Sequence, residues 1–302
     1  MRDSDNKNLI TLLTKIYQAR GLDFTQYKIS MVQRRVRSRM LKCNVSTYED
    51  YFRILDQQPD ELGHLIQSFS IQVTELFRNP ESFNAIRDIV IPQIIISKRE
   101  KQHKIIKAWS CGCSTGDEPY SLAMLFLEKL GAARDRFILT ILGTDIDDRA
   151  IREAGDTEFE KDQISALNQD IIRNYFVKHA HSKFKIADPV RNLVRLRHHD
   201  VINDIPYMHC DVILCRNVLI YFNKELQQET QLKFYDCLNP GGFLVLGMTE
   251  SLIGSASEYF EPVNNSLRIY RRPIARTTGA EKDREVLSQN DIDRIIKEMT
   301  EE

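Results

Sequence analysis

The sequence predicts an α/β protein whose mostly parallel sheet follows a purely helical N-terminal region. From residue 105 onward, short apolar runs typical of buried strands alternate with segments of helical length. Before that point, residues 1–75 contain few glycines and repeat their apolar residues at helical spacing. A small-residue turn from Gly112 to Gly116 joins the first strand-like run to a helix. Because ligands of such sheets bind beyond the carboxyl ends of the strands, this turn is the first candidate for a binding site.

Residues 1–75 are predicted to form a helical N-terminal domain, because apolar side chains recur every three or four residues. The residues that define this pattern are Leu9, Leu12, Leu13, Ile16, Tyr17, Tyr48, Tyr51, Phe52 and Leu55. A linking helix is predicted over 76–97, with Asn79-Pro80 as its entry.

The sheet domain is predicted over 98–272. Its strands are expected near 105–109, 137–142, 211–215, 243–247 and 266–270, and a helix is expected over 224–237. Residues 160–200 interrupt the alternation with a helical part and two alternating runs, 182–186 and 193–197. The two runs predict a hairpin within a small inserted subdomain. Residues 273–302 are expected to be a linker and a short amphipathic helix.

Composition indicates no general affinity for nucleic acid or membrane. Lys and Arg total 42 and Asp and Glu total 43 among 302 residues, which gives a net charge of −1. The polar start of the chain and the absence of a membrane-spanning apolar run predict a cytoplasmic protein without direct membrane insertion. Six cysteines are present, but Cys111 and Cys113 have no second pair or histidine at metal spacing, so reduced thiols and no metal site are expected.

A basic segment lies within the helical region. Arg34, Arg35, Arg37 and Arg39 fall between Gln33 and Lys42, and on a helix Arg35 and Arg39 are neighbours. This concentration of positive charge is compatible with a solvated helix face. Because it stands out against a neutral chain, it is also compatible with a docking surface for an acidic partner.

The turn before the helix carries two acids, Asp117 and Glu118, where a phosphate group would need the positive end of the helix dipole. No Gly-x-Gly-x-x-Gly motif and no P-loop is present. Asp145 ends a strand about 30 residues later, the place where nucleotide-binding folds put an acid that contacts ribose hydroxyls. An adenosine with a cationic, zwitterionic tail fits these residues, which indicates S-adenosylmethionine. A strand-end acid can also cap the next helix, and Asp147 is the better candidate for that role.

Four sequence motifs, which follow one another in the same order as in a known family, carry a resemblance to that family. They are Thr74-Glu-Leu-Phe-Arg78, Trp109-Ser-x-x-x-Ser-Thr-Gly-Asp-Glu-Pro-Tyr-Ser121, Gly143-Thr-Asp-Ile-Asp147 and Cys215-Arg-Asn-Val-Leu-Ile-Tyr-Phe222. Together they closely resemble the chemotaxis receptor methyltransferases, the CheR family, and the resemblance runs from residue 10 to residue 270. It implies a Rossmann-like class I methyltransferase sheet with an all-helical N-terminal domain and a small inserted β subdomain.

The resemblance also implies an activity. Members of this family use S-adenosyl-L-methionine to methylate glutamate side chains on the cytoplasmic helices of chemoreceptors, with S-adenosyl-L-homocysteine as the product. The arginine-rich helix would then dock the glutamate-rich receptor surface. In some members the inserted hairpin holds a receptor peptide, and Lys183 and Lys185 are compatible with such a role.

Residue roles follow from the matched motifs. Thr74 and Arg78 match the cofactor-binding and catalytic segment, and Gln72 stands where many members have asparagine. Glu118 matches the acid that holds the methionine amino group, and Asp145 matches the acid that contacts adenosine.

Further matches lie later in the chain. Asp200 and Val201 stand where the family usually reads Asn-Leu beside the adenine, and Arg216 and Asn217 match a pair that lines the same pocket. Tyr221 matches the tyrosine near the transferred methyl group. Arg78 could orient the substrate carboxylate, or it could form an ion pair with an acid of the pocket.

The role of the C-terminal tail and two alternative functions of the chain are considered separately. Residues 286–299 resemble the peptide by which flagellar switch proteins bind the response regulator CheY, but a frayed tail or a helix docked on its own domain is equally compatible. A nucleic-acid methyltransferase is disfavoured, because the fourth strand ends in Cys215-Arg-Asn-Val and not in Asp/Asn-Pro-Pro-aromatic. The alternative from another class is an inactive or differently targeted CheR-like signalling adaptor.

Overall fold

The structure is a computed structural model that describes residues 3–69, 74–179 and 183–274. The chain divides into two compact units, each treated by itself below. The first holds the described part of Met1–Val73 together with Leu219–Glu229, and the second holds Thr74–Val218 and the described part of Thr230–Glu302. Two sequence predictions, the contact of Gln72 and the helix over 286–299, lie outside the described residues.

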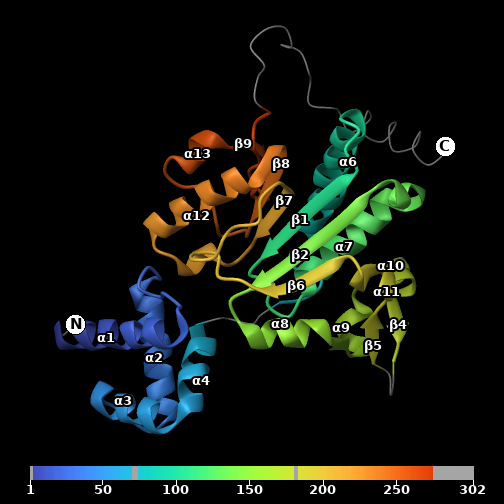
Figure 1. The fold of residues 1–302 in the computed structure, drawn as a ribbon. Helices are drawn as coiled ribbons and strands as arrows, with labels where there is room; N and C mark the ends of the chain where they lie inside the picture. The colour runs from blue at the N-terminus through green and yellow to red at the C-terminus, as the bar shows by residue number, and fades with distance from the viewer. Residues whose placement is uncertain (1–2, 70–73, 180–182, 275–302) are drawn as a thin grey trace. The chain divides into compact units, whose positions relative to one another are not determined.

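The first unit is helical, as the apolar spacing predicts. It contains α1 (Asp3–Arg20), α2 (Ile29–Lys42), α3 (Tyr48–Gln57), α4 (Pro59–Phe69) and a 3₁₀ turn over Leu219–Tyr221 (Figure 1). Its core is built from Leu9, Leu12, Leu13, Ile16, Val32, Val36, Tyr51, Leu65 and Phe69, all buried. Thr47 accepts a hydrogen bond from Asp50 N and so caps α3.

A buried carboxylate holds three helices of this unit together. Glu61 on α4 pairs with both Arg39 Nε, at 2.9 Å, and Arg39 Nη2 on α2, and it accepts a hydrogen bond from Tyr51 Oη on α3 at 2.8 Å. Burial raises the pKa of Glu61, but the bonds from Arg39 and Tyr51 outweigh burial and leave the pKa below its ordinary value.

This ion pair separates Arg39 from the other three arginines that are predicted to form one docking surface. Arg34 and Arg37 are exposed on α2, whereas Arg39 is mostly buried against Glu61. Arg35 is half-buried, and its Nε is enclosed. The expectation that Arg39 belongs to a solvated basic face is therefore wrong, because a partner 22 residues away in sequence withdraws it from the surface.

The second unit is built on a seven-stranded sheet with the order β6-β2-β1-β7-β8-β10-β9. The strands are β1 (Ile105–Cys111), β2 (Ile138–Asp145), β6 (Val194–His198), β7 (Cys210–Cys215), β8 (Leu238–Leu246), β9 (Glu261–Asn264) and β10 (Ile269–Arg271). Neighbours from β6 to β8 pair in parallel, and β10 is antiparallel to both of its neighbours. The mostly parallel sheet, the helical N-terminal region and the small second sheet described below confirm the predicted α/β fold class.

Helices cover both faces of this sheet (Figure 1). The helical elements that accompany this sheet are α5 (Pro80–Ala85), a π turn (Ile86–Val90), α6 (Ile91–Glu100), α7 (Asp117–Leu130), a 3₁₀ turn (Gly131–Arg136), α8 (Asp148–Gly155), α12 (Lys224–Cys237) and α13 (Ala256–Tyr259). Of α12, the part from Thr230 onward belongs to this unit. Ile106 and Ala108 of β1 belong to the core shared with α6 and α7. The next residue, Trp109, contacts Phe234 of α12, because successive strand residues point to opposite faces.

A second, three-stranded sheet has the order β3-β5-β4. It consists of β3 (Glu158–Phe159), β4 (Phe176–Lys178) and β5 (Phe184–Ile186), accompanied by α9 (Lys161–Ser165), α10 (Gln169–Tyr175) and α11 (Asp188–Arg191). The predicted hairpin between 182–186 and 193–197 is wrong. Leu193 precedes β6, which pairs in parallel with β2 at the edge of the large sheet, whereas β5 pairs with β3 and β4.

None of the described helices has the length and apolar character that crossing a bilayer requires.

Removal of the Glu61 side chain is expected to destabilise the helical unit strongly. In Glu61→Ala, a mostly buried arginine and a buried tyrosine hydroxyl lose their partner, which costs on the order of 3–5 kcal/mol. Because the pKa of Glu61 is lowered by folding, its contribution is present above pH about 4.5 and is lost as the pH falls further. Urea unfolding of the full chain, followed by circular dichroism at pH 7.5 and pH 3.5, measures both effects.

The matched control is Asp60→Ala, which removes the adjacent, exposed acid of the same helix turn. Its expected cost is below about 1 kcal/mol. Equal losses in the two variants at pH 7.5 would contradict the assigned role of Glu61.

Candidate active site

The predicted turn connects β1 to α7 and is fixed by backbone contacts with β2. Gly112 N and Cys113 N both donate to Thr144 O, at 2.7 and 2.9 Å. Gly112 has φ +75°, and a Cβ at this position would lie 2.3 Å from Val218 Cγ2. Glycine is therefore required, because the turn packs directly against the segment that follows β7.

Asp145, at the end of β2, holds the next residue of the turn. Its Oδ2 accepts a hydrogen bond from Ser114 N at 2.8 Å, and its Oδ1 accepts one from Asp147 N at 3.0 Å. Burial raises the pKa of Asp145, although both backbone donors oppose this effect. Asp147 caps α8 through Arg149 N and Ala150 N, as the sequence predicts, so Asp145 is not that helix's cap.

Glu118 lies in the first turn of α7 and is held from two neighbouring strands. Ser110 Oγ donates to its Oε1 at 2.8 Å, and Arg216 Nη1 lies 3.2 Å from its Oε2. Ser110 belongs to β1, and Arg216 directly follows β7. The carboxylate is thus placed at the carboxyl edge of the sheet and keeps lone pairs beyond the two that these donors use.

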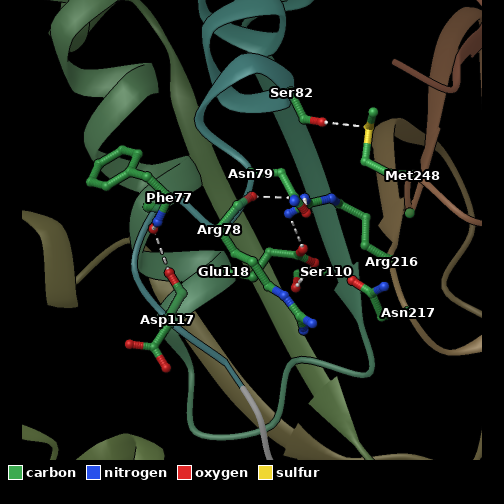
Figure 2. A network of polar contacts seen from close by, with 12 residues as sticks. Phe77, Arg78, Asn79, Ser82, Ser110, Asp117, Glu118, Arg216, Asn217 and Met248 are labelled. Atoms are coloured by element: carbon green, nitrogen blue, oxygen red, sulfur yellow. Dashed lines mark hydrogen bonds and ion pairs between the residues drawn. The ribbon is translucent and has the colours of Figure 1, made fainter. Parts of the chain in front are cut away.

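Arg216 is the central cation of the site (Figure 2), and its side chain is only 2 % exposed. Besides Glu118, its Nη2 donates to Arg78 O at 2.7 Å and to Asn79 Oδ1 at 2.8 Å. Its guanidinium also lies over the Phe83 ring, 5.2 Å from the centroid. Arg216 therefore joins the segment before α5 to the start of α7.

Arg78 and Thr74 reach the same region from the segment that precedes α5. Figure 2 shows the Arg78 side chain extending on the side of Glu118 and Asn217. The Thr74 hydroxyl hydrogen-bonds Asp117, the first residue of α7, and so favours its ionised form. Burial is the larger effect and raises the pKa of Asp117 to about 6, although Thr115 also donates to this carboxyl at 3.2 Å.

Asn217 directly follows Arg216 and has a left-handed backbone with φ +62°. Its N–H donates to the buried carboxylate of Glu250, with an N to Oε2 distance of 2.9 Å. Arg216 and Asn217, predicted from one motif, thus lie with Arg78 and Glu118 around the carboxyl ends of β1 and β7 (Figure 2).

Asp200 and Val201 follow β6 at the same edge of the sheet. Asp200 Oδ1 accepts a hydrogen bond from Ile202 N and Oδ2 accepts one from Asn203 Nδ2, both at 2.8 Å. Val201 O accepts a hydrogen bond from Lys233 Nζ at 3.0 Å. Asp200 therefore stabilises the turn over residues 200–203 by accepting these two hydrogen bonds. An aspartate in place of the asparagine that the family usually has there is sufficient for this role.

Tyr221 belongs to the first unit and not to the unit that holds the other site residues. It packs against the helical core, and its carbonyl accepts a hydrogen bond from Lys28 N at 2.8 Å. Its predicted place beside the transferred methyl group therefore continues to rest on the sequence motif alone.

Four contributors to the site escaped the sequence prediction: Asn79, Ser110, Ser114 and Glu250. Ser110 and Ser114 stand inside the turn motif, so the motif itself contained their signal. The sequence Asn79-Pro80 predicts only a helix entry, whereas Asn79 has φ +58° and its Oδ1 accepts a hydrogen bond from Arg216. Glu250 stands outside all four motifs, and only its spacing of three residues from Gly247, at the end of a strand, could have drawn attention to it.

The donors and acceptors at this edge suit an adenosine with an amino-acid tail. Glu118 and Asp145 offer carboxylate oxygens to an ammonium group and to hydroxyls. Four enclosed polar atoms of the described residues have no hydrogen-bond partner within the protein, and two of them, Ser114 Oγ and Arg216 Nε, belong to this site. Enclosed polar atoms are normally satisfied, so a polar ligand at this edge is expected.

Comparison with known proteins places the chain in a family. Residues 72–269 match the family model described as "CheR methyltransferase, SAM binding domain", and residues 7–70 match "CheR methyltransferase, all-alpha domain". A "Chemotaxis protein methyltransferase" of Listeria innocua is 32% identical over 245 residues, which are 81% of this chain and 90% of the relative.

Two further relatives have similar names. The "Chemotaxis protein methyltransferase" of Listeria monocytogenes is 31% identical over 81% of this chain and 90% of its own length. The "Chemotaxis protein methyltransferase 2" of Vibrio cholerae is 29% identical over 78% of this chain and 82% of its own length. The resemblance inferred from the four motifs is confirmed: this chain belongs to the CheR family of S-adenosylmethionine-dependent methyltransferases.

Proposed function

We propose that this protein transfers a methyl group from S-adenosylmethionine to glutamate side chains on the cytoplasmic helices of chemoreceptors. The observation that carries the proposal is the similarity to chemotaxis protein methyltransferases over about four fifths of the chain. The exposed arginines of α2 support an acidic substrate surface. With such a receptor as substrate, the reaction would take place in the cytoplasm. A CheY-like partner for residues 286–299 stays a prediction from the sequence.

The cofactor contacts are assigned to groups whose chemistry fits them. Glu118 would hold the methionine amino group, because its carboxylate is fixed by Ser110 and Arg216 and keeps acceptor capacity. Asp145 and Ser114 would bind ribose hydroxyls, and Asp200 and Val201 would flank the adenine.

The reaction needs positioning more than proton transfer. The bound cofactor supplies a methyl group on a sulfonium, and the acceptor is a glutamate carboxylate that is already ionised at neutral pH. No general base is therefore required, and the protein orients the two reactants and excludes water. Arg78 would orient the incoming carboxylate through a charge-assisted hydrogen bond, and Tyr221 would pack beside the methyl group.

The docking role is proposed for only part of the basic helix. Arg34 and Arg37 are three residues apart on α2 and both are exposed, so they face the same side of the helix. Arg35 lies beside them and is half-buried, whereas Arg39 has the structural role described above. The proposed receptor-facing surface therefore consists of Arg34 and Arg37, flanked by Arg35.

The proposal is tested by incubating the full chain with purified chemoreceptor and methyl-labelled S-adenosylmethionine. Labelled receptor that releases volatile methanol on base treatment identifies a glutamyl methyl ester and supports the proposal. Cofactor binding by calorimetry without methyl transfer to any receptor offered would contradict it and would favour the signalling adaptor.

Loss of the Glu118 charge is expected to weaken cofactor binding. Glu118→Gln removes the proposed partner of a cationic amino group and the partner of a buried arginine, so the Kd for S-adenosylmethionine should rise at least about tenfold. Calorimetric titration of the full chain measures the change. Glu128→Gln, at an exposed position of the same helix, is the control and should bind normally. Equal affinity of the Glu118 variant and the wild type would remove Glu118 from the cofactor site.

Charge reversal on α2 is expected to affect the receptor and not the cofactor. The double variant Arg34→Glu, Arg37→Glu should raise the KM for receptor about tenfold by replacing attraction with repulsion, while the Kd for S-adenosylmethionine stays unchanged. Steady-state methylation at low and high salt measures the effect, which salt should diminish. Arg20→Glu, Arg53→Glu makes the same change in net charge at exposed positions of the same unit and should leave KM unchanged. A parallel rise in both double variants would argue against a localised docking surface.

Asp117 makes stability depend on pH. Folding raises the pKa of this acid from 3.8 to about 6, so the native state is penalised once the pH is high enough to ionise it. A difference of about two pH units corresponds to roughly 3 kcal/mol. Asp117→Asn should therefore raise Tm at pH 7.5, and the gain should disappear as the pH falls from 6 to 4. Thermal unfolding at several pH values checks this, with Asp148→Asn, an exposed first-turn acid of α8, as the control. A gain that is independent of pH would contradict the burial argument.

A further inference from the structure

Glu250 is a buried carboxylate, 5 % exposed, in the loop that follows β8. One of its oxygens, Oε2, accepts hydrogen bonds from two backbone donors: Gly247 N at 2.6 Å and Asn217 N at 2.9 Å. Its own N–H donates to Gly247 O at 2.9 Å. Since Asn217 follows β7 and Gly247 follows β8, this single oxygen joins the carboxyl ends of two neighbouring parallel strands.

The close approach depends on Gly247 having no side chain. A Cβ there would lie 2.6 Å from Glu250 Oε2 and 2.8 Å from Asn217 N. Neither contact is possible for a real Cβ atom, so glycine is required at position 247 for the Glu250 carboxylate to lie where it does.

Asn217 is the residue whose conformation Gly247 and Glu250 together fix. Its φ of +62° lies in the left-handed region, which is uncommon for residues other than glycine, and the hydrogen bond from its N–H to Glu250 Oε2 holds the backbone in that conformation. The residue before it is Arg216, which binds Glu118. The residue after it is Val218, whose Cγ2 occupies the space beside Gly112 of the cofactor turn. The direction of the chain at Asn217 therefore sets the positions of both neighbours.

The Glu250 loop is anchored on its other side as well. Ser82 Oγ of α5 lies 3.5 Å from Met248 Sδ, as Figure 2 shows. Asn79, which begins the same helix, accepts a hydrogen bond from Arg216. Loop 247–250 and the Arg216–Val218 segment are thus both tied to α5, and Glu250 is the direct link between them.

We propose that Glu250 is a positioning residue of the S-adenosylmethionine site. By accepting Asn217 N and Gly247 N on one oxygen, it fixes the segment 216–218 in the conformation that presents Arg216 to Glu118 and seats Val218 against Gly112. The proposal rests on the cofactor site and not on the receptor substrate, so it stands or falls on cofactor binding whatever the methyl acceptor is.

The test compares two substitutions at this position in the full chain. Glu250→Ala leaves two backbone donors without an acceptor, and the Kd for S-adenosylmethionine should rise at least about tenfold. Glu250→Gln can place its amide oxygen where Oε2 lies and keep both bonds, so its Kd should stay within about threefold of the wild type. Hydrogen exchange of the cofactor-free protein provides a readout that needs no ligand, and the amides of Asn217 and Gly247 should exchange faster in the alanine variant than in the glutamine variant.

Asp211→Ala is the matched control for a purely structural effect. Asp211 is equally buried and stands at the opposite, amino end of β7, where it accepts a hydrogen bond from Lys107 N and pairs with Lys98. Its loss should lower Tm while cofactor affinity in the folded protein stays normal. A wild-type Kd in Glu250→Ala, or equal weakening in Glu250→Ala and Asp211→Ala, would overturn the proposal. A glutamine variant as impaired as the alanine variant would also overturn it, because the acceptor geometry would then not be what matters.

Discussion

The site depends on a buried positive charge, Arg216. Taking a guanidinium out of water is costly, and the cost is offset only if its N–H groups find well-placed acceptors. Here the acceptors are the Glu118 carboxylate, the Arg78 carbonyl and the Asn79 side chain, which come from different segments of the chain. Because each acceptor must stay within hydrogen-bond distance, this one side chain sets the relative positions of the segment before α5, the start of α7 and the end of β7.

Much of this arrangement could be predicted from sequence because it is local or topological. Strands that alternate with helices form a parallel sheet, and the carboxyl ends of its strands meet at one edge. The turn at Gly112 and the pair Arg216–Asn217 directly follow strands, and Asp145 ends one, so their convergence follows from the topology. Three of the four motifs that carry the family resemblance mark places where the chain leaves a strand at that edge, and the family models confirm the resemblance.

The parts that escaped prediction depend on contacts between residues distant in sequence. The run 193–197 alternates as a hairpin strand would, yet it joins β2 of the large sheet, and periodicity does not identify the partner of a strand. Arg39 is indistinguishable in sequence from Arg34 and Arg37, but Glu61, on another helix, pairs with it and leaves it mostly buried. Glu250 stands outside every motif, and only the fold brings it to Asn217.

Helix α2 has a structural face and an exposed face, and this separation determines which of its arginines can be replaced without loss of stability. The residue that stabilises the helical unit, Arg39, and the residues exposed on the surface, Arg34 and Arg37, use different faces of one helix. Substitutions on the exposed face leave the buried ion pair untouched, so their effect on folding is small. The charge of this exposed face can therefore change by substitution at Arg34 and Arg37 while the ion pair that holds the helical unit together stays as it is.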